Sequence, residues 1–498
     1  MRKKLILTLS SIILLSALLA TPVLANDLLP NWLDSRWESD PLFQGKPNPN
    51  AYKNAEPGDK VPGYWWRDTT NQNAIHQYYF QNYQPRVENP APGVFVFTNF
   101  GKSQVVGLVG ETGWVLIDTL ESPERMAPVV GIMENMNGLP IKALIYTSEK
   151  LDHLMGSNVV EAGTPVYASS QLVEVFISQY AEYQGVLPRI KRTIGQALDF
   201  GPDGRLGLPT EVELRAFRIP SNHITEPTVV DLVDRTVVLI PSSSASHARL
   251  MVYLPVEKVL IQGYTVTSAF PDIGPLTGPT PSIDAWISDI DTMIALDVKT
   301  LISTFGNGMI IKNNPLLVDQ TLTNYRDAIQ HVHDRTLVLM NTDSGLTLTA
   351  EDIVPQVNLP DHLASLPYLQ EFENNIPSAV KAIYHEHAGW FNGAPPELAS
   401  TLSTTRQAEI MADLAGGMTH LIDKAKKAEL DAQDLPSAEE ALLLAYSAYK
   451  AAIDSEYEED AAGIYIQALK KNAYMQKSDQ IRNYYLSTAK ELEIRYGQ

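Results

Sequence analysis

The chain has 498 residues, 58 acidic against 38 basic residues, a formal net charge of -20 and no cysteine. This length predicts more than one domain, and the lack of cysteine excludes disulfides and thiolate metal sites, so any zinc would be bound by His, Asp or Glu. Because nucleic acids and anionic membrane surfaces repel an acidic chain without a basic stripe, we expect neither as a partner.

The first 25 residues have the pattern of a secretory signal peptide. Arg2, Lys3 and Lys4 form a basic start, a mostly apolar run follows over residues 5–20, and a small-residue site ends at Ala25. The apolar run is short for a membrane span. We therefore expect cleavage after Ala25, a periplasmic or secreted protein, and no transmembrane anchor.

Residues 26–90 are rich in Pro, Asn, Asp and aromatic residues with weak periodicity, which predicts an irregular lead-in. From 91 to 375, β-rich runs and helical segments are interspersed, which indicates an α/β domain built as a β-sandwich flanked by helices. Strands are expected at 94–97, 104–109, 114–117, 143–146, 165–168, 212–218, 229–233, 236–240, 251–254, 259–261 and 300–304, and helices at 123–137, 170–180 and 284–296.

After residue 375 the β pattern disappears. Helices are expected at 379–387, 407–428, 438–455 and 460–496, in segments rich in Ala, Leu, Glu and Lys with apolar residues at helical spacing. Residues 376–498 therefore form a predicted all-α domain, a type of module that commonly binds partners.

A polar loop follows the strand expected at 143–146. It reads Thr-Ser-Glu-Lys-Leu-Asp-His-Leu-Met-Gly over residues 147–156, and the carboxyl end of a buried strand is where α/β folds place their chemistry. The loop resembles the metal loop of the metallo-β-lactamase superfamily, Thr-His-x-His-x-Asp-His-x-x-Gly. Asp152 and His153 match, as do the terminal Thr and Gly, whereas Ser148 and Lys150 stand at the first two histidines.

Three further segments resemble secreted alkylsulfatases, metallo-β-lactamase-fold hydrolases with a helical dimerisation domain. They are GETGWVLID at 110–118, KAIYHEHAGWFNG at 381–393 and RNYYLSTAKEL at 482–492. The resemblance implies an αββα sandwich over residues 91–375, a helical dimerisation domain over 376–498, and a homodimer.

The same resemblance implies two zinc ions, but most of their ligand positions are replaced. At the first metal, Ser148, Lys150 and Ala245 stand in place of ligands, and at the second metal Tyr264 and Phe305 do so. Thr277 stands in place of the arginine that would bind the sulfate. Asp152 and His153 remain as a remnant of the second site, and His247 lies near the first in sequence. One carboxylate and one imidazole make a weak metal site.

These replacements favour a degenerate metal site without zinc-dependent sulfatase activity and without a cofactor. We expect the old cleft to bind a ligand or partner, with an alkyl or lipid-like small molecule as a candidate. The candidates for chemistry in the cleft are Asp152, His153, Lys150 and Tyr264, and those for binding are Ser148, His223, His247 and Thr277. The plainer interpretation of Asp152 and His153 is structural: hydrogen bonds that hold the loop.

Two alternatives stay open, so the sequence does not decide whether the protein is an enzyme. The first is an active hydrolase of alkyl sulfates or related esters, with zinc in an incomplete or rearranged site of Asp152, His153 and His247. The second is an enzyme with different, metal-free chemistry in the same cleft, using Lys150, Tyr264, His153 or Glu149. Metal analysis would separate the first alternative from a site that binds no zinc.

Overall fold

The computed structural model describes residues 85–182, 185–199, 204–205, 213–244, 248–278, 282–305, 308–342, 348–391, 394–398 and 401–497. The expected signal peptide, the lead-in up to residue 84, and positions Ala245 and His247 lie outside the described residues. Within the described part of the chain, no helix has the length and apolar character needed to cross a bilayer.

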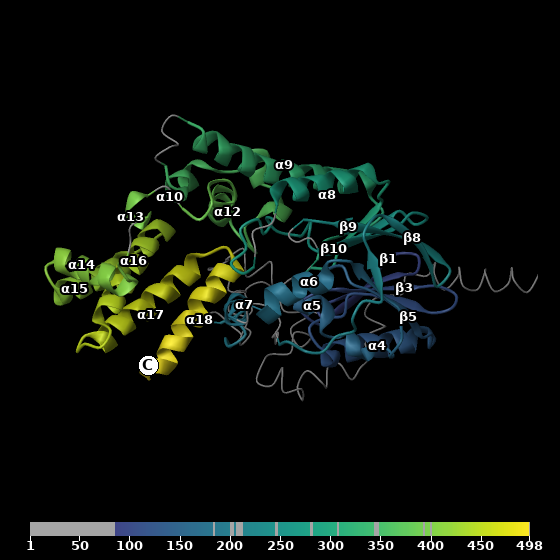
Figure 1. The fold of residues 1–498 in the computed structure, drawn as a ribbon, viewed down its shortest axis with the longest axis horizontal. Coiled ribbons are helices and arrows are strands. Elements are labelled where there is room, and N and C mark those ends of the chain that lie inside the picture. Colours follow the sequence, from purple (N-terminus) through teal and green to yellow (C-terminus); the bar gives the residue numbers. More distant parts are fainter. Residues whose placement is uncertain are drawn as a thin grey trace, which may run out of the picture.

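Two β-sheets lie face to face in the first part of the chain (Figure 1). The seven-stranded sheet has the order β1-β2-β3-β4-β5-β6-β7, antiparallel up to β4 and parallel from β4 to β7. The six-stranded sheet has the order β13-β12-β11-β10-β9-β8, in which only β11 and β12 are parallel. The strands are β1 (Arg86–Ala91), β2 (Val94–Thr98), β3 (Val105–Val109), β4 (Trp114–Ile117), β5 (Ile141–Ile145), β6 (Val166–Ser169), β7 (Asn222–Ile224), β8 (Thr228–Leu232), β9 (Arg235–Ser242), β10 (Arg249–Leu254), β11 (Val259–Gln262), β12 (Thr300–Ser303) and β13 (Ile310–Ile311).

Aliphatic side chains from both sheets form the core between them. Val115 and Ile117 of β4 meet the inner faces of strands such as β10 and β11, which contribute Val252 and Ile261. The other side chains of β4 point outward, yet all four of its residues are buried. Because helices cover the outer face of each sheet, the central strands are continuous apolar runs rather than alternating ones.

Helices cover both outer faces of the sandwich, which gives four layers (Figure 1). Helices α4 (Pro123–Asn137), α5 (Leu151–Leu154), α6 (Leu172–Phe176) and α7 (Val186–Thr193), with the π-helix η5 (Ile177–Glu182), lie over the seven-stranded sheet. Helices α8 (Ile283–Ala295), α9 (Pro315–Met340) and α12 (Ile376–Ala388) lie over the other sheet. The predicted α/β class and αββα sandwich are confirmed.

Short helical turns connect these layers: η4 (Ser157–Val159), α10 (Ala350–Ile353), η6 (Val354–Gln356), α11 (Asp361–Ala364) and η7 (Pro367–Leu369).

The rest of the described chain is helical, which confirms the predicted all-α C-terminal region. Its helices are α13 (Pro395–Leu398), α14 (Thr404–Ala415), α15 (Met418–Asp431), α16 (Leu435–Ala452), α17 (Glu458–Met475) and α18 (Asp479–Tyr496). Alanines dominate the core of α14 to α17, so these helices approach closely. Helix α18 packs against α7 of the sandwich, where Asn483 Nδ2 donates to the carbonyl of Thr193 over 3.0 Å and Arg192 pairs with Glu491 at 2.7 Å.

Several predicted elements differ in detail from the structure. The helix expected at 407–428 is divided into α14 and α15 because Gly416 and Gly417 both have positive φ, 98° and 111°. The helix expected at 460–496 is divided before α18, whose cap Ser478 accepts a hydrogen bond from the amide of Ile481. Residues 213–218 form no strand, α9 was not predicted, and β1 begins at residue 86, within the expected lead-in.

Candidate functional site

The candidate site lies where strand ends of both sheets meet. Asp118 follows β4 and Thr147 follows β5, while Thr304 follows β12 of the other sheet. The hydroxyls of Thr147 and Thr304 lie 3.2 Å apart across the sandwich. Gly263, directly after β11, packs so closely that a Cβ there would lie 2.9 Å from Thr147 Oγ1. The sequence-predicted polar loop is therefore held at the carboxyl ends of parallel strands in both sheets.

Asp118 is the central acceptor of this site, and its backbone is left-handed with φ 61°. Its carboxylate accepts from Thr147 N at 2.8 Å, Thr147 Oγ1 at 2.6 Å and Thr304 Oγ1 at 2.8 Å. His153 Nδ1 lies 2.8 Å from Asp118 Oδ2, and both side chains are 0% exposed. Since a carboxylate accepts, Nδ1 carries the proton. Burial alone would lower the pKa of His153, but the contact with Asp118 raises it above its usual value.

Different partners hold the two remnant residues of the loop. Asp152 accepts a hydrogen bond from Ser103 Oγ. Burial opposes ionisation of Asp152, yet the nearby Lys102, His153 and Ser103 lower its pKa to about 2. His153 Nε2 is buried, and no described residue is its hydrogen-bond partner. His153 therefore offers one nitrogen to the site while the other fixes the ring.

A buried arginine and two aromatic rings fill another part of the site. Arg249, at the start of β10, has its Nε 3.6 Å from Glu149 Oε2, with side chains 3% and 0% exposed. Its guanidinium carbon lies 4.8 Å from the ring centroid of Tyr264, which is a cation–π distance. The ring of Tyr264 meets that of Phe305 at 4.1 Å between centroids. The two positions that the resemblance assigns to ligands of the second metal thus carry contacting aromatic rings, and a cation lies over one of them.

The hydroxyl of Tyr264 also has a partner. It donates to Asp272 Oδ2 over 2.6 Å, and Asn374 Nδ2 donates to the other oxygen of that carboxylate. Burial, followed by the nearby Asp272, raises the pKa of Tyr264 well above its usual value. Tyr264 is therefore a neutral hydrogen-bond donor at physiological pH.

Ser148 and Lys150 lie beside this cluster. Ser148 Oγ accepts from the backbone amide of Lys150 at 3.1 Å and lies 3.5 Å from Glu149 Oε2. Lys150 is half-buried, and burial lowers the pKa of its ammonium group although the charges of Glu149, Asp272 and Asp152 raise it. The loop that resembles a metal loop therefore carries a lysine side chain near a second basic side chain, Arg249.

The structure does not bring every predicted site residue to this cluster. His223 is exposed on β7, the edge strand, two strands away from β5. Thr277 is half-buried in the segment between β11 and α8. His247 lies outside the described residues, so its predicted role stays a prediction.

Sequence reasoning missed Asp118 and Arg249 as site residues. Asp118 ends the segment Gly-Glu-Thr-Gly-Trp-Val-Leu-Ile-Asp, and a polar residue directly after a buried strand is a signal that could have marked it. Arg249 carries no such signal, because arginine is mostly exposed in proteins and here opens a strand whose six residues are all buried.

The described residues do not fit the two-zinc centre that the resemblance implies. Among them, no group of three or more His, Asp or Glu side chains is arranged to hold a metal ion. The Asp118 carboxylate is engaged by hydroxyl, amide and imidazole groups, and Glu149 faces Arg249. We therefore derive no reaction step through a metal.

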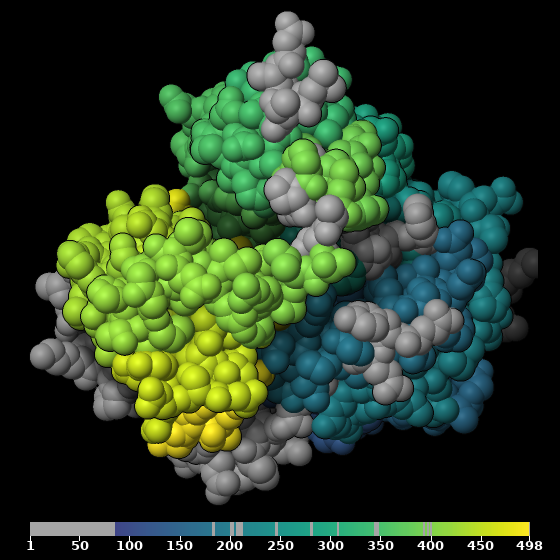
Figure 2. Space-filling model, turned by 60° about the vertical axis from the view of Figure 1, so that its left-hand side comes forward, coloured from purple at the N-terminus to yellow at the C-terminus, as the bar shows by residue number. Residues whose placement is uncertain are grey.

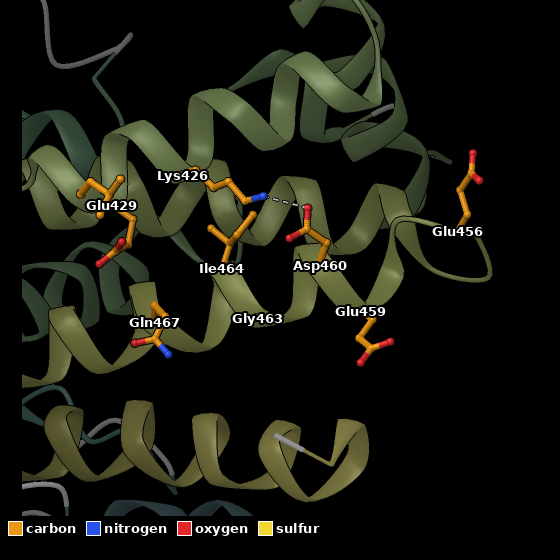
Figure 3. A pocket seen from close by; sticks show the side chains of 9 residues that line it. Lys426, Glu429, Glu456, Glu459, Asp460, Gly463, Ile464 and Gln467 are labelled. Carbon is orange, nitrogen blue, oxygen red and sulfur yellow. Dashed lines mark hydrogen bonds and ion pairs between the residues drawn. The ribbon is translucent and has the colours of Figure 1, made fainter.

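A hollow of about 690 Å³ lies away from this site, on the helical region between α15 and α17 (Figure 3). Its lining residues are Lys426, Glu429, Leu430, Glu456, Glu459, Asp460, Gly463, Ile464 and Gln467. Lys426 Nζ pairs with Asp460 at 2.9 Å, and Glu429 pairs with Lys471 at 3.3 Å. Side chains of Lys426 and Asp460 are about half exposed, so this hollow is a solvated, charged surface.

Two family matches cover this architecture. Residues 100–304 match the metallo-beta-lactamase superfamily, and residues 349–494 match the alkyl sulfatase dimerisation family. The chain contains a metallo-β-lactamase-superfamily domain followed by an alkyl sulfatase dimerisation domain. This confirms the family that the loop and the three segments indicated. The dimerisation match begins before α12, which packs on α9 of the sandwich layer.

Relatives with known names are alkylsulfatases. The chain is 26% identical to a linear primary-alkylsulfatase of a Pseudomonas strain, over 76% of this chain and 72% of that protein. It is 23% identical to an alkyl/aryl-sulfatase of Saccharomyces cerevisiae, over 74% of this chain and 58% of that protein. The solved structure of a stereoselective inverting sec-alkylsulfatase from Pseudomonas superimposes with a TM-score of 0.78 at 19% identity, covering 91% of this chain and 71% of that one. At this identity the structural likeness establishes the fold.

Proposed function

We propose that this chain is an exported, homodimeric, alkylsulfatase-like protein with a degenerate metal site. It lacks zinc-dependent sulfatase activity and binds a small molecule with an alkyl or lipid-like part through the old site. The relatives are named for alkyl sulfates, so an alkyl chain is the ligand component that this fold suits best.

The observation that carries the proposal is the contact between Tyr264 and Phe305 under Arg249. Two rings with centroids 4.1 Å apart take the volume of a carboxylate and an imidazole, and neither ring is a metal ligand. A guanidinium carbon 4.8 Å from the Tyr264 centroid adds a positive charge that would repel a divalent cation nearby. A hydroxide held at neutral pH needs a metal with enough ligands, which this arrangement does not favour.

Hydrolysis of dodecyl sulfate with added zinc tests the proposal. We expect no turnover by the wild type and none by the Ser148→His, Lys150→His double variant. The double variant restores two ligands of the first metal, but Tyr264 and Phe305 remain at the second. Losses around metal ligands weaken binding about 10–100-fold, and missing ligands cost more.

A zinc-loaded alkylsulfatase relative is the positive control for that assay. Robust zinc-dependent turnover by the wild type would contradict the proposal outright. Turnover by the double variant alone would show that the aromatic pair matters less than proposed. Native mass spectrometry of the purified protein tests the ligand, with a co-purifying alkyl or lipid-like mass as the expected result.

One observation favours the alternative of an active hydrolase with a rearranged metal site. His153 Nε2 is buried without a hydrogen-bond partner among the described residues, and Asp152 belongs to the same helical turn. With a third ligand these two residues would hold one zinc, which would supply Lewis-acid activation of an ester. The dodecyl sulfate assay separates this alternative from the main proposal, because only the alternative predicts wild-type turnover that a chelator abolishes.

A further inference from the structure

Helix α14 carries two apolar faces, of which one packs against neighbouring helices. Ala408 and Ala412 are buried, and α14 contacts α15 and α16 on that side. Ile410, Met411 and Leu414 lie on a second face, because residues three or four apart share one side of a helix. An amphipathic surface helix ordinarily needs only one apolar stripe, so the second stripe requires an explanation.

The second face is exposed and has no charged residue. Ile410 and Met411 are 36% and 37% exposed, and Leu414 is 82% exposed, the highest fraction among the large hydrophobic side chains of the described residues. Leu402, 49% exposed, adjoins it, since Gln407 Nε2 donates to the Leu402 carbonyl over 3.2 Å. These four residues, Leu402, Ile410, Met411 and Leu414, are called the α14 outer face.

The charges of α14 lie on a third side of the helix. Arg406 pairs with Glu409 at 2.7 Å, and Asp413 lies one turn further along the same side. The outer face is thus bordered by charges but contains none, as expected of the apolar centre of a protein interface. Helices α14 and α15 stand at the end of the molecule farthest from the sandwich (Figure 1), and light-green helices of this region form an outer surface (Figure 2).

We propose that the α14 outer face is the contact surface for a second copy of this chain. The face lies within residues 349–494, the segment that matches the alkyl sulfatase dimerisation family. With a net charge of -20, two copies repel each other, so a charge-free apolar face is where they approach at least cost. In a two-fold dimer the same patch serves both subunits, and apolar stripes of Ile, Met and Leu are self-complementary.

This inference rests on the proposed homodimer and names its surface. Sedimentation equilibrium of the mature chain tests both, using Leu414→Glu and Met411→Glu, with Val256→Glu as the matched control. Val256 is 79% exposed on the sandwich, and Leu414 is similarly exposed, so neither change disturbs packing within one chain. We expect both α14 variants to weaken dimerisation at least about 100-fold, since they place a carboxylate in an apolar interface, and the control to dimerise as wild type does.

The possible outcomes separate the two ideas. A monomeric wild type would defeat the homodimer and with it this inference. A dimeric wild type with equally dimeric Leu414→Glu and Met411→Glu would leave the homodimer standing and overturn only the proposed face. Circular dichroism of each variant verifies that loss of the dimer is not loss of the fold.

A thiol-protection experiment identifies what covers the face. The chain has no cysteine, so Leu414→Cys and Val256→Cys each create a single thiol. Above the dissociation constant of the dimer, we expect maleimide to react with the thiol at 414 at least about 10-fold more slowly than with the thiol at 256, and dilution to the monomer should remove the difference. Equal rates in the dimer would overturn the inference. Protection that persists in the monomer would assign the face to another segment of the same chain and overturn it as well.

Discussion

Replacing Arg249 should destabilise the sandwich strongly. Arg249 and Glu149 are 3% and 0% exposed, with Nε and Oε2 3.6 Å apart, so the Arg249→Met variant leaves the Glu149 carboxylate in the interior without this cation. Removing one partner of a buried ion pair costs about 3–5 kcal/mol. The Arg249→Met substitution also removes the cation–π contact, in which the guanidinium carbon lies 4.8 Å from the ring centroid of Tyr264. We therefore expect the free energy of unfolding to fall by about 3–5 kcal/mol.

Urea unfolding followed by tryptophan fluorescence measures this loss, and a double-mutant cycle with Glu149→Gln isolates the pair. The Arg249→Met, Glu149→Gln double variant should recover at least about 2 kcal/mol of the loss, because no buried charge is then left alone. Arg192→Met is the matched control: its partner Glu491 is closer, at 2.7 Å, but the two side chains are 30% and 51% exposed. That control should lose at most about 1 kcal/mol. A coupling energy near zero between Arg249 and Glu149 would refute the reasoning.

Three further predictions follow from other features. Light scattering of the full-length mature protein at micromolar concentration should give about twice the monomer mass, and a clean monomer would contradict the homodimer. Mass spectrometry of the natively exported protein should find a chain that begins at or near Asn26, whereas an intact Met1 would count against export. Burial opposes ionisation of Glu88, but Lys312 and Arg86 outweigh it and lower the pKa of this carboxyl in the folded state. Ionised Glu88 therefore stabilises the fold above its unfolded pKa of about 4.3, and this contribution is lost as the pH falls through the folded pKa. The Glu88→Gln variant should therefore lose about 0.5–1 kcal/mol at pH 7, and this difference should shrink as the pH falls below about 4.3; a pH-independent difference would contradict this sign.

The fold followed from the sequence because the strands of the sandwich are short, apolar and separated by clear turns. β4 was predicted with its observed bounds, since Trp114 to Ile117 form a continuous apolar run between Gly113 and Asp118. Helix α4 was predicted equally well, because Ser122 and Pro123 mark its start and Gly138, with φ 64°, its end. Helix α9 was missed, because its apolar residues are interrupted by polar ones and its mean hydropathy is close to neutral.

The candidate site was predicted only in part, because it depends on contacts between distant segments. Ser148, Lys150, Asp152 and His153 lie in one loop, so a local pattern was enough to find them. The contact between Tyr264 and Phe305 arises because they follow the neighbouring parallel strands β11 and β12, 41 residues apart in the chain. No local pattern indicates that these two rings meet or that a buried arginine covers one of them.

Zinc content of the natively exported, purified protein tests the degenerate metal centre most directly. Elemental analysis after dialysis against micromolar zinc, with protein concentration from amino-acid analysis, gives the number of ions per chain. Because Tyr264 and Phe305 stand where the resemblance implies metal ligands, and Arg249 lies over the Tyr264 ring, we predict well under one tightly bound zinc per chain. Two tightly held zinc ions per chain would contradict the proposed function.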